Sequence, residues 1–315
     1  MRRGKTILAA LAIASASPAT EAAAASAAYV SRTGTATTVC AVTAPCGTMG
    51  NAAGAAGAGG VVFCLDKGAY GLVNITFSIS IFCGDGLWEA PGAQMTITLA
   101  NTTDKVILEG VTSDGVTLSG ATIIFNGKGS LELRNARLGN GAGSSSDLLS
   151  FTPTGGSSLL VTDSFFYDAP GSAGILIKPQ NSSAYANAHI RGTKFSRNLD
   201  GVVADGSLTS VGVNVNIDDS ATNDNVGNGF RAIGAIAPAF TTISVRNTQI
   251  SGNLTNGVLA TGAQGVIELH NCMFTANFNA VQTLTGGIVR SYGTNEVSLN
   301  GNNNAFGFTG SVALQ

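Results

Sequence analysis

Apolar and polar residues alternate along most of this chain with the two-residue period of a half-buried β-strand. In "ISVRNTQI", residues 243–250, and "IELHNCMF", residues 267–274, the first and third positions are apolar and the second and fourth are polar. Successive side chains of a strand point to opposite faces, so this period buries one face and exposes the other. The pattern predicts short strands, and the scarcity of strong helix formers predicts few long helices.

The alternating segment is one part of a longer repeat. Successive copies begin 22 to 29 residues apart, and each continues to a further apolar position and then to a third short segment such as "GVLATG", residues 257–262. Three strands and three turns therefore fill one repeat. The nine copies begin at Ile79, Val106, Leu131, Leu159, Ala188, Val215, Ile243, Ile267 and Val289.

Aligning the copies produces columns of like residues. An asparagine stands ten places after the repeat start in four consecutive copies. Seven places after the repeat start stands an apolar residue such as Phe166 or Phe195. Strands stack at about 4.8 Å, so equivalent positions of stacked coils lie over one another. We expect an internal hydrogen-bonded ladder of asparagines and a stack of aromatic rings. The ladder residues are Asn198, Asn225, Asn253 and Asn277.

Two repeat architectures have periods of this length. Leucine-rich repeats require leucine at fixed positions and a helical segment on the convex side, and this chain has neither. Strand–turn units with turns rich in Gly, Asn, Asp and Ser favour a β-helix. The predicted fold is therefore all-β, a single-stranded right-handed parallel β-helix of about nine coils over residues 61–304, with three short strands per coil.

The ends of the chain differ from the repeats. Residues 1–27 have a basic start, a short apolar stretch and small residues suited to cleavage, which is typical of a secretory signal peptide. In residues 28–60 we expect a disulfide loop followed by a short helix that caps the apolar core. The Ala-rich segment of this range predicts the helix. Residues 305–315 are interpreted as a C-terminal tail. The expected location is secreted or periplasmic, with no membrane span after removal of the signal.

Export makes the five cysteines candidates for disulfide bonds. Cys40 and Cys46 are close enough to close a small loop, and Cys64 and Cys83 flank two strand-like segments, so we predict these two pairs. Cys272 then remains as a buried, inert thiol. No CxxC pair is present and the two histidines are far apart in sequence, so we expect neither a metal site nor a cofactor.

The sequence resembles the secreted bacterial right-handed parallel β-helix proteins of the pectin-lyase-like superfamily, over residues 29–304. The resemblance rests on "AYVSRTGTATTVCAVTAPCGTM" from residue 28, "AGGVVFCLDKGAYGLVNITFSISIFCGDG" from residue 58, and the coils with "NLDGVVADG" and "NLTNGVLATG". It implies a polysaccharide or cell-surface glycan as partner, lying along an outer face of the solenoid. Many members of the branch have no assigned activity, and the catalytic motifs of pectate lyases and polygalacturonases are absent here.

Two aspartates are candidates for catalysis. Asp163 and Asp219 stand in one column two coils apart, about 9 to 10 Å, near the upper end of the carboxyl separation in inverting glycoside hydrolases. Arg191 lies beside them. The alternative is that Asn, Asp and Gly recur in this column because a tight turn requires them. Asp200 and Asp205 in "DGVVADG" are interpreted as turn residues only.

Charged residues of the neighbouring column are candidates for binding an acidic sugar. Asp218 and Arg246 follow Arg191 on adjacent coils, and Tyr167 is a candidate platform for a sugar ring. The alternative is a surface ladder of alternating charge. Charged residues make up only 11% of the chain and the net charge is -2, which gives no basic surface for nucleic acid. We expect a noncatalytic glycan-binding or surface-structural protein; the alternative is a polysaccharide lyase or glycoside hydrolase.

Overall fold

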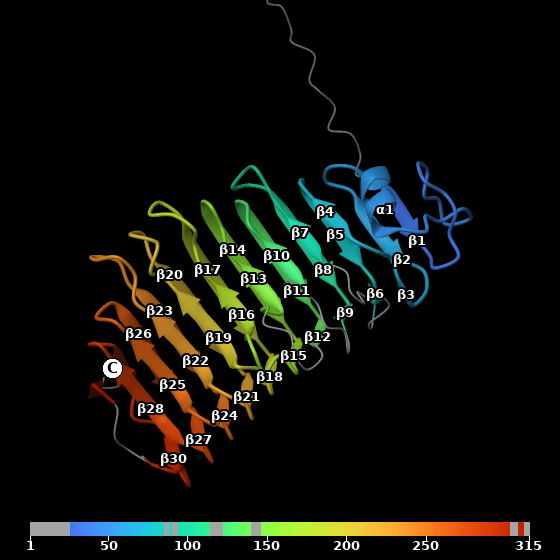
Figure 1. Cartoon of the computed structure of the whole chain (residues 1–315). Coiled ribbons are helices and arrows are strands. Elements are labelled where there is room, and N and C mark those ends of the chain that lie inside the picture. Colours follow the sequence, from blue (N-terminus) through green and yellow to red (C-terminus); the bar gives the residue numbers. More distant parts are fainter. Residues whose placement is uncertain are drawn as a thin grey trace, which may run out of the picture.

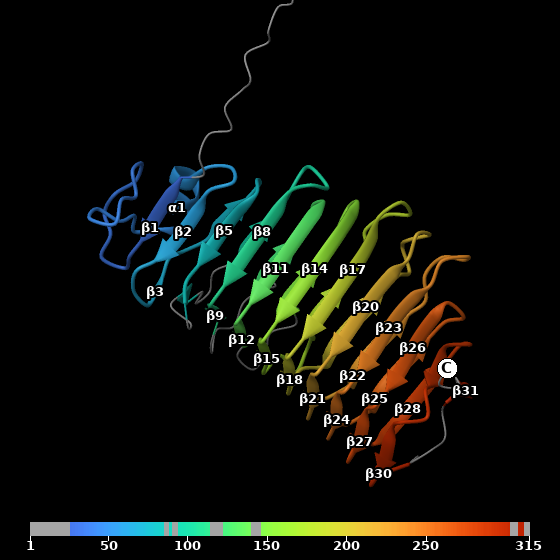
Figure 2. The same ribbon diagram turned by 180° about the vertical axis from the view of Figure 1, so that it is seen from behind.

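The computed structural model describes residues 26–84, 88–89, 94–113, 122–139, 146–302 and 308–311. The predicted signal peptide, residues 1–27, and the predicted tail, residues 305–315, lie mostly outside the described residues. The described chain forms an all-β parallel solenoid with three sheets (Figures 1 and 2). The parallel β-helix predicted from the repeat is confirmed.

Sheet 1 has twelve strands and runs the length of the solenoid. Within its register the predicted repeat starts pair in unbroken succession, from Ile79 opposite Val106 to Ile267 opposite Val289. Its strands are β1 (Ala27–Val30), β2 (Val61–Cys64), β5 (Ile79–Phe82), β8 (Lys105–Glu109), β11 (Gly129–Arg134), β14 (Gly156–Thr162), β17 (Tyr185–Arg191), β20 (Val213–Asp218), β23 (Thr241–Arg246), β26 (Gly265–His270), β29 (Ile288–Ser291) and β31 (Gly310–Ser311).

Sheets 2 and 3 complete each coil. Sheet 2 has ten strands and sheet 3 has nine. The number of coils therefore depends on the sheet in which the strands are counted, and it differs slightly from the nine predicted. Sheet 2 consists of β3 (Gly68–Ala69), β6 (Trp88–Glu89), β9 (Val111–Ser113), β12 (Arg137–Gly139), β15 (Phe165–Tyr167), β18 (Lys194–Ser196), β21 (Ala221–Asn223), β24 (Gln249–Ser251), β27 (Met273–Thr275) and β30 (Glu296–Ser298). Sheet 3 consists of β4 (Val73–Ile75), β7 (Met95–Ile97), β10 (Ile123–Phe125), β13 (Leu149–Phe151), β16 (Ala173–Ile177), β19 (Asp200–Asp205), β22 (Asn228–Ile233), β25 (Asn256–Thr261) and β28 (Asn279–Leu284).

The N-terminal end of the solenoid is covered by helix α1 (Met49–Ala56), which packs against β1, β2 and β4 (Figure 1). The Thr48 hydroxyl accepts a hydrogen bond from the Asn51 N–H and caps its first turn. Gly57 ends it in the left-handed region, at φ 68°. The helix buries Met49 and three alanines against the first coils, so the apolar core is not open at this end.

The predicted asparagine ladder runs inside the turn between sheets 2 and 3. The side-chain amide of Asn225 donates to Asn253 Oδ1 at 2.8 Å, and that of Asn253 donates to Asn277 Oδ1 at 2.8 Å. Asn198 joins through its backbone N–H, which donates to Asn225 Oδ1. The structure adds a fifth member, Asn300, which accepts from Asn277 at 2.9 Å. All five are buried, so the ladder satisfies polar groups that water does not reach.

A second ladder, which we did not predict, begins where sheet 3 starts. Asp200 Oδ1 accepts hydrogen bonds from the backbone and the side-chain amide of Asn228, both at 2.7 Å. Asn256 donates to Asn228, and Asn279 donates to Asn256. The interpretation of Asp200 and Asp205 as turn residues is therefore wrong: they are the buried first and last residues of β19, where hydrogen bonds and, for Asp205, an ion pair with Lys178 compensate their burial.

Both predicted disulfides, Cys40–Cys46 and Cys64–Cys83, are formed, and Cys272 is a buried free thiol. Burial raises the pKa of Cys272 to about 11. The thiolate is the reactive form, so we expect the native protein to resist a thiol reagent at pH 8 and to react after unfolding in denaturant. Counting labelled thiols by mass spectrometry tests this. Rapid labelling of the native protein would show that the C-terminal coils open.

Candidate functional site

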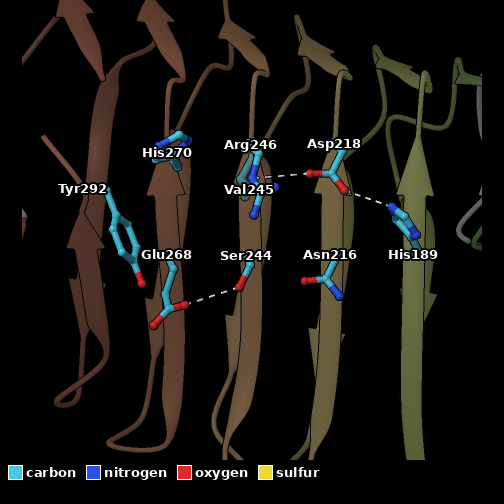
Figure 3. Close-up of a pocket in the computed structure, with 9 residues that line it drawn as sticks. All are labelled: His189, Asn216, Asp218, Ser244, Val245, Arg246, Glu268, His270 and Tyr292. Atoms are coloured by element: carbon cyan, nitrogen blue, oxygen red, sulfur yellow. Dashed lines mark hydrogen bonds and ion pairs between the residues drawn. The ribbon is translucent and has the colours of Figure 1, made fainter. Parts of the chain in front are cut away.

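The outer face of sheet 1 carries a hollow of about 330 Å³ that crosses four neighbouring strands, β17, β20, β23 and β26, and reaches Tyr292, which directly follows β29. Residues at alternate positions of these strands point away from the apolar core, so the side chains that line the hollow are mostly polar. It is lined by His189, Asn216, Asp218, Ser244, Val245, Arg246, Glu268, His270 and Tyr292 (Figure 3).

A second hollow of about 390 Å³ continues the first toward the N-terminus. It includes Lys105, Glu132 and Asn187, and it shares His189 and Asn216 with the first hollow. Together the two extend from β8 to β29, seven strand spacings or about 34 Å along the solenoid. We call this continuous depression the sheet 1 groove. Its length is that of an extended chain molecule rather than of a small ligand.

The charged groups at the centre of the groove are paired. His189 Nε2 lies 2.9 Å from Asp218 Oδ2, and Arg246 Nε lies 3.9 Å from Asp218 Oδ1. Figure 3 shows these side chains pointing toward one another from three neighbouring strands. The carboxylate of Asp218 is therefore held between two basic side chains, and the outer donors of Arg246 face the solvent, where its side chain is 65% exposed.

The C-terminal part of the groove combines a second ion pair with an aromatic ring. Glu268 lies 3.0 Å from Arg290 and accepts a hydrogen bond from the Ser244 hydroxyl at 3.4 Å. The ring of Tyr292 meets that of His270 edge to face, with centroids 6.1 Å apart. The buried Nδ1 of His270 has no hydrogen-bond partner among the described residues. This part offers an aromatic surface beside hydrogen-bonding groups, a combination suited to sugar rings.

Glu132 sets the charge at the N-terminal part of the groove. Burial acts to raise the pKa of Glu132, but hydrogen bonds from Lys105, 2.6 Å away, and from Arg134 bring it below its ordinary value. The Glu132 carboxyl is therefore ionised, and the charges of Lys105 and Arg134 offset its negative charge. Along the whole groove the described carboxylates have cationic neighbours.

The two aspartates predicted for catalysis lie at the corner between sheets 1 and 2. The column that holds them adopts the left-handed conformation throughout, with φ of 50° at Asp163, 61° at Gly192 and 49° at Asp219. Asn, Asp and Gly tolerate this conformation best, which accounts for their recurrence here. Asp219 pairs with Arg191 at 3.3 Å and accepts from the Asn247 amide. Their catalytic role stays a prediction.

Of the residues predicted to bind sugar, Asp218 and Arg246 line the sheet 1 groove, whereas Tyr167 does not. Tyr167 belongs to sheet 2, is only 8% exposed and stacks on Phe165 with ring centroids 4.5 Å apart. Little of its ring is free for a sugar, and stacking by Tyr167 stays a prediction.

Sequence reasoning missed most of the groove because it followed one column of the repeat. The column two places earlier, which pairs strand to strand, supplies the other half of the groove. The same alignment contains the signal, since this column is polar over four consecutive coils and ends in a basic residue. Its members are His189, Asn216, Ser244, Glu268 and Arg290.

Two classes of site find no support among the described residues. No three His, Cys, Asp or Glu side chains lie close enough together there to hold a metal ion. Neither does the described part contain a helix of the length and apolarity needed to cross a bilayer.

The stacked coils, three parallel sheets and internal asparagine ladder define a parallel β-helix. Among solved structures, pectate lyase Pel9A is similar, with a TM-score of 0.55 and 15% sequence identity; the match covers 84% of this chain and 74% of that one. At this identity the likeness concerns the fold alone. Comparison with protein-family models and with curated protein sequences finds no match.

Proposed function

We propose that this chain is a secreted glycan-binding β-helix that holds a polysaccharide in the sheet 1 groove without cleaving it. The observation that carries the proposal is the continuity of the groove over eight strands, from β8 to β29, with shared residues where its two hollows meet. A rigid sheet presents the polar side chains at a fixed spacing, so successive sugar units meet equivalent positions on successive coils.

The chemistry of the groove supports a polysaccharide with acidic units. Arg246 lines the groove and Arg290 adjoins it through its ion pair with Glu268, and both side chains are partly exposed beside their carboxylate partners. A guanidinium binds a carboxylate through two parallel hydrogen bonds. Asn216 and Ser244 provide neutral groups for hydroxyls, and Tyr292 provides a ring face. The predicted signal peptide and the two formed disulfides support a location outside the cytoplasm.

Binding is favoured over cleavage by the state of the acidic groups. Hydrolysis by two carboxyl groups requires one that is protonated and one that is free to activate water. In the groove Glu268 lies 3.0 Å from Arg290 and Glu132 lies 2.6 Å from Lys105, while Asp218 lies between His189 and Arg246. These basic side chains already occupy the three carboxyl groups, so none of the three is free to activate water.

Replacing Arg246 with glutamine is expected to weaken binding of an acidic polysaccharide about tenfold, the loss of one charge-assisted contact. The measurement is titration calorimetry with a panel of acidic and neutral polysaccharides of plant and bacterial origin. Arg197→Gln is the matched control, because Arg197 is an exposed, ion-paired arginine on the other side of sheet 2 from the groove. Equal effects of both variants, or no binding to any member of the panel, would refute the groove.

The cleavage alternative is tested on the same panel by assaying new reducing ends and unsaturated products. We expect neither. Products that disappear in Asp163→Asn or Asp219→Asn would replace the binding proposal with an enzyme that acts at the corner of the solenoid. Products that persist in both variants would eliminate these two residues and place the chemistry elsewhere.

A further inference from the structure

A separate hollow of about 590 Å³ lies at the corner where sheet 1 turns into sheet 2. It spans three consecutive coils, at the turns that follow β11, β14 and β17. We call it the corner pocket. Its chemically distinct residues are Asn135, Arg137, Asp163, Phe165, Gly192 and Lys194.

Among the described residues the ionic groups of the corner pocket have no ion-pair partner, unlike those of the sheet 1 groove. No carboxylate lies within 4.0 Å of the Arg137 guanidinium or the Lys194 ammonium among the described residues, and the Asp163 carboxylate has no ion pair there. With two cations and one anion, the pocket carries a net charge of +1. A ligand with one negative charge would neutralise it.

Gly192 opens the pocket by interrupting a ladder. Farther along the same column Asn247 donates a hydrogen bond to Asp219, and Asn271 donates one to Asn247. These side chains therefore satisfy one another's hydrogen-bonding groups. At Gly192 there is no side chain to continue the ladder toward Asp163. A Cβ there would meet Asp163 Oδ1 at 2.5 Å, and the φ of 61° disfavours other residues as well. Asp163 Oδ1 therefore occupies the place that a side chain at position 192 would take, and Asp163 is one of the residues that line the hollow.

Arg137 is held by aromatic rings instead of by a carboxylate. Its guanidinium carbon lies 5.7 Å from the centroid of Phe165 and 5.9 Å from that of Tyr167, and these two rings stack on each other. Stacking orients the planar group and leaves its N–H donors free in the plane. Phe165 stands between Arg137 and Lys194 in the register of sheet 2, so the two cations flank an aromatic side chain.

We propose that the corner pocket binds a carboxylate-bearing sugar unit, at a site distinct from the sheet 1 groove. Arg137 takes the carboxylate through two hydrogen bonds, and Lys194 adds its charge from the next-but-one coil. The sugar ring covers Phe165, the Asp163 carboxylate accepts hydrogen bonds from sugar hydroxyls, and the Asn135 amide donates to them. The corner pocket recognises a single sugar unit or the end of a sugar chain, and it needs no extended polysaccharide.

The test uses glucuronate, with glucose as the matched ligand that lacks only the carboxylate. In NMR titrations of the whole protein we expect glucuronate to shift the Arg137 side-chain Nε–H signal saturably and to leave that of Arg197 in place. Glucose should shift neither. Arg137→Gln should weaken glucuronate binding about tenfold, whereas Arg197→Gln, at an exposed arginine outside both sites, should leave it unchanged.

Asp163→Ala provides an independent measurement. Because Asp163 is assigned to the hydroxyls, this variant should lose the preference of the pocket for glucuronate over acetate while retaining binding of both. A glucuronate response that saturates at Arg246 and not at Arg137, an equal response to glucose, or an unchanged preference in Asp163→Ala would each overturn the proposal. Failure of polysaccharide to bind the groove would leave these results untouched, so the two sites are tested separately.

Discussion

Replacing Asn253 with alanine is expected to lower the free energy of unfolding by about 3 kcal/mol. Asn253 is fully buried; it accepts from the Asn225 amide at 2.8 Å and donates to Asn277 at 2.8 Å. Alanine removes both bonds and also the acceptor of the buried Asn225 backbone N–H, which donates to Asn253 Oδ1 at 3.3 Å, and it leaves that N–H in an interior without a replacement partner. Such orphaned groups cost more than the bonds themselves contribute. Chemical denaturation followed by circular dichroism measures the change.

Asn187→Ala is the matched control for this prediction. Asn187 belongs to an exposed asparagine pair on sheet 1, where it accepts from Asn214 at 3.3 Å. Water replaces that bond, so the variant should lie within about 0.5 kcal/mol of the parent. If Asn253→Ala were as mild as Asn187→Ala, the buried ladder would contribute nothing to holding the coils together.

Phe195→Ala is expected to cost about 4 kcal/mol, the largest effect of a single substitution that we predict. The Phe195 ring is fully buried between coils, stacked on Phe166 at 5.4 Å and meeting Phe230 edge to face at 6.3 Å. The backbone around it is fixed by hydrogen bonds to the coils on both sides, so the cavity cannot collapse. The same denaturation measurement gives the value.

Phe278→Ala is the matched control, because it removes a phenylalanine ring that is not buried in the core. Phe278 lies on a turn and is 53% exposed, so its truncation opens no cavity and should cost less than about 1 kcal/mol. Comparable losses in both variants would mean that the central rings are not packed between the coils, and that the columns of the repeat are not superposed in the core.

The architecture was predictable because a parallel solenoid converts sequence period into spatial register. Each coil contributes one residue to each column, so alternation fixed which side chains point inward, and the repeat starts fixed which strands pair. This is why the nine repeat starts align in sheet 1 and why Asn198, Asn225, Asn253 and Asn277 form one ladder. The asparagine signal was strong because one residue type recurred at one offset.

The groove was less predictable because its contacts run diagonally between columns. His189 and Asp218 belong to different columns of adjacent coils, and their pairing depends on side-chain length and direction, which alignment does not supply. The second ladder was hidden for a related reason. Its first member is an aspartate and its later members are asparagines, so the column has no single residue type that would mark it, and Asp200 by itself was interpreted as a turn residue.

A crystal structure of the protein with a bound acidic oligosaccharide would show whether the sheet 1 groove holds a glycan. We predict an intact oligosaccharide along sheet 1, parallel to the direction in which the coils stack, with a carboxylate on Arg246 and a sugar unit beside His189. An oligosaccharide bound across the outer face of sheet 3, or found cleaved in the crystal, would contradict it.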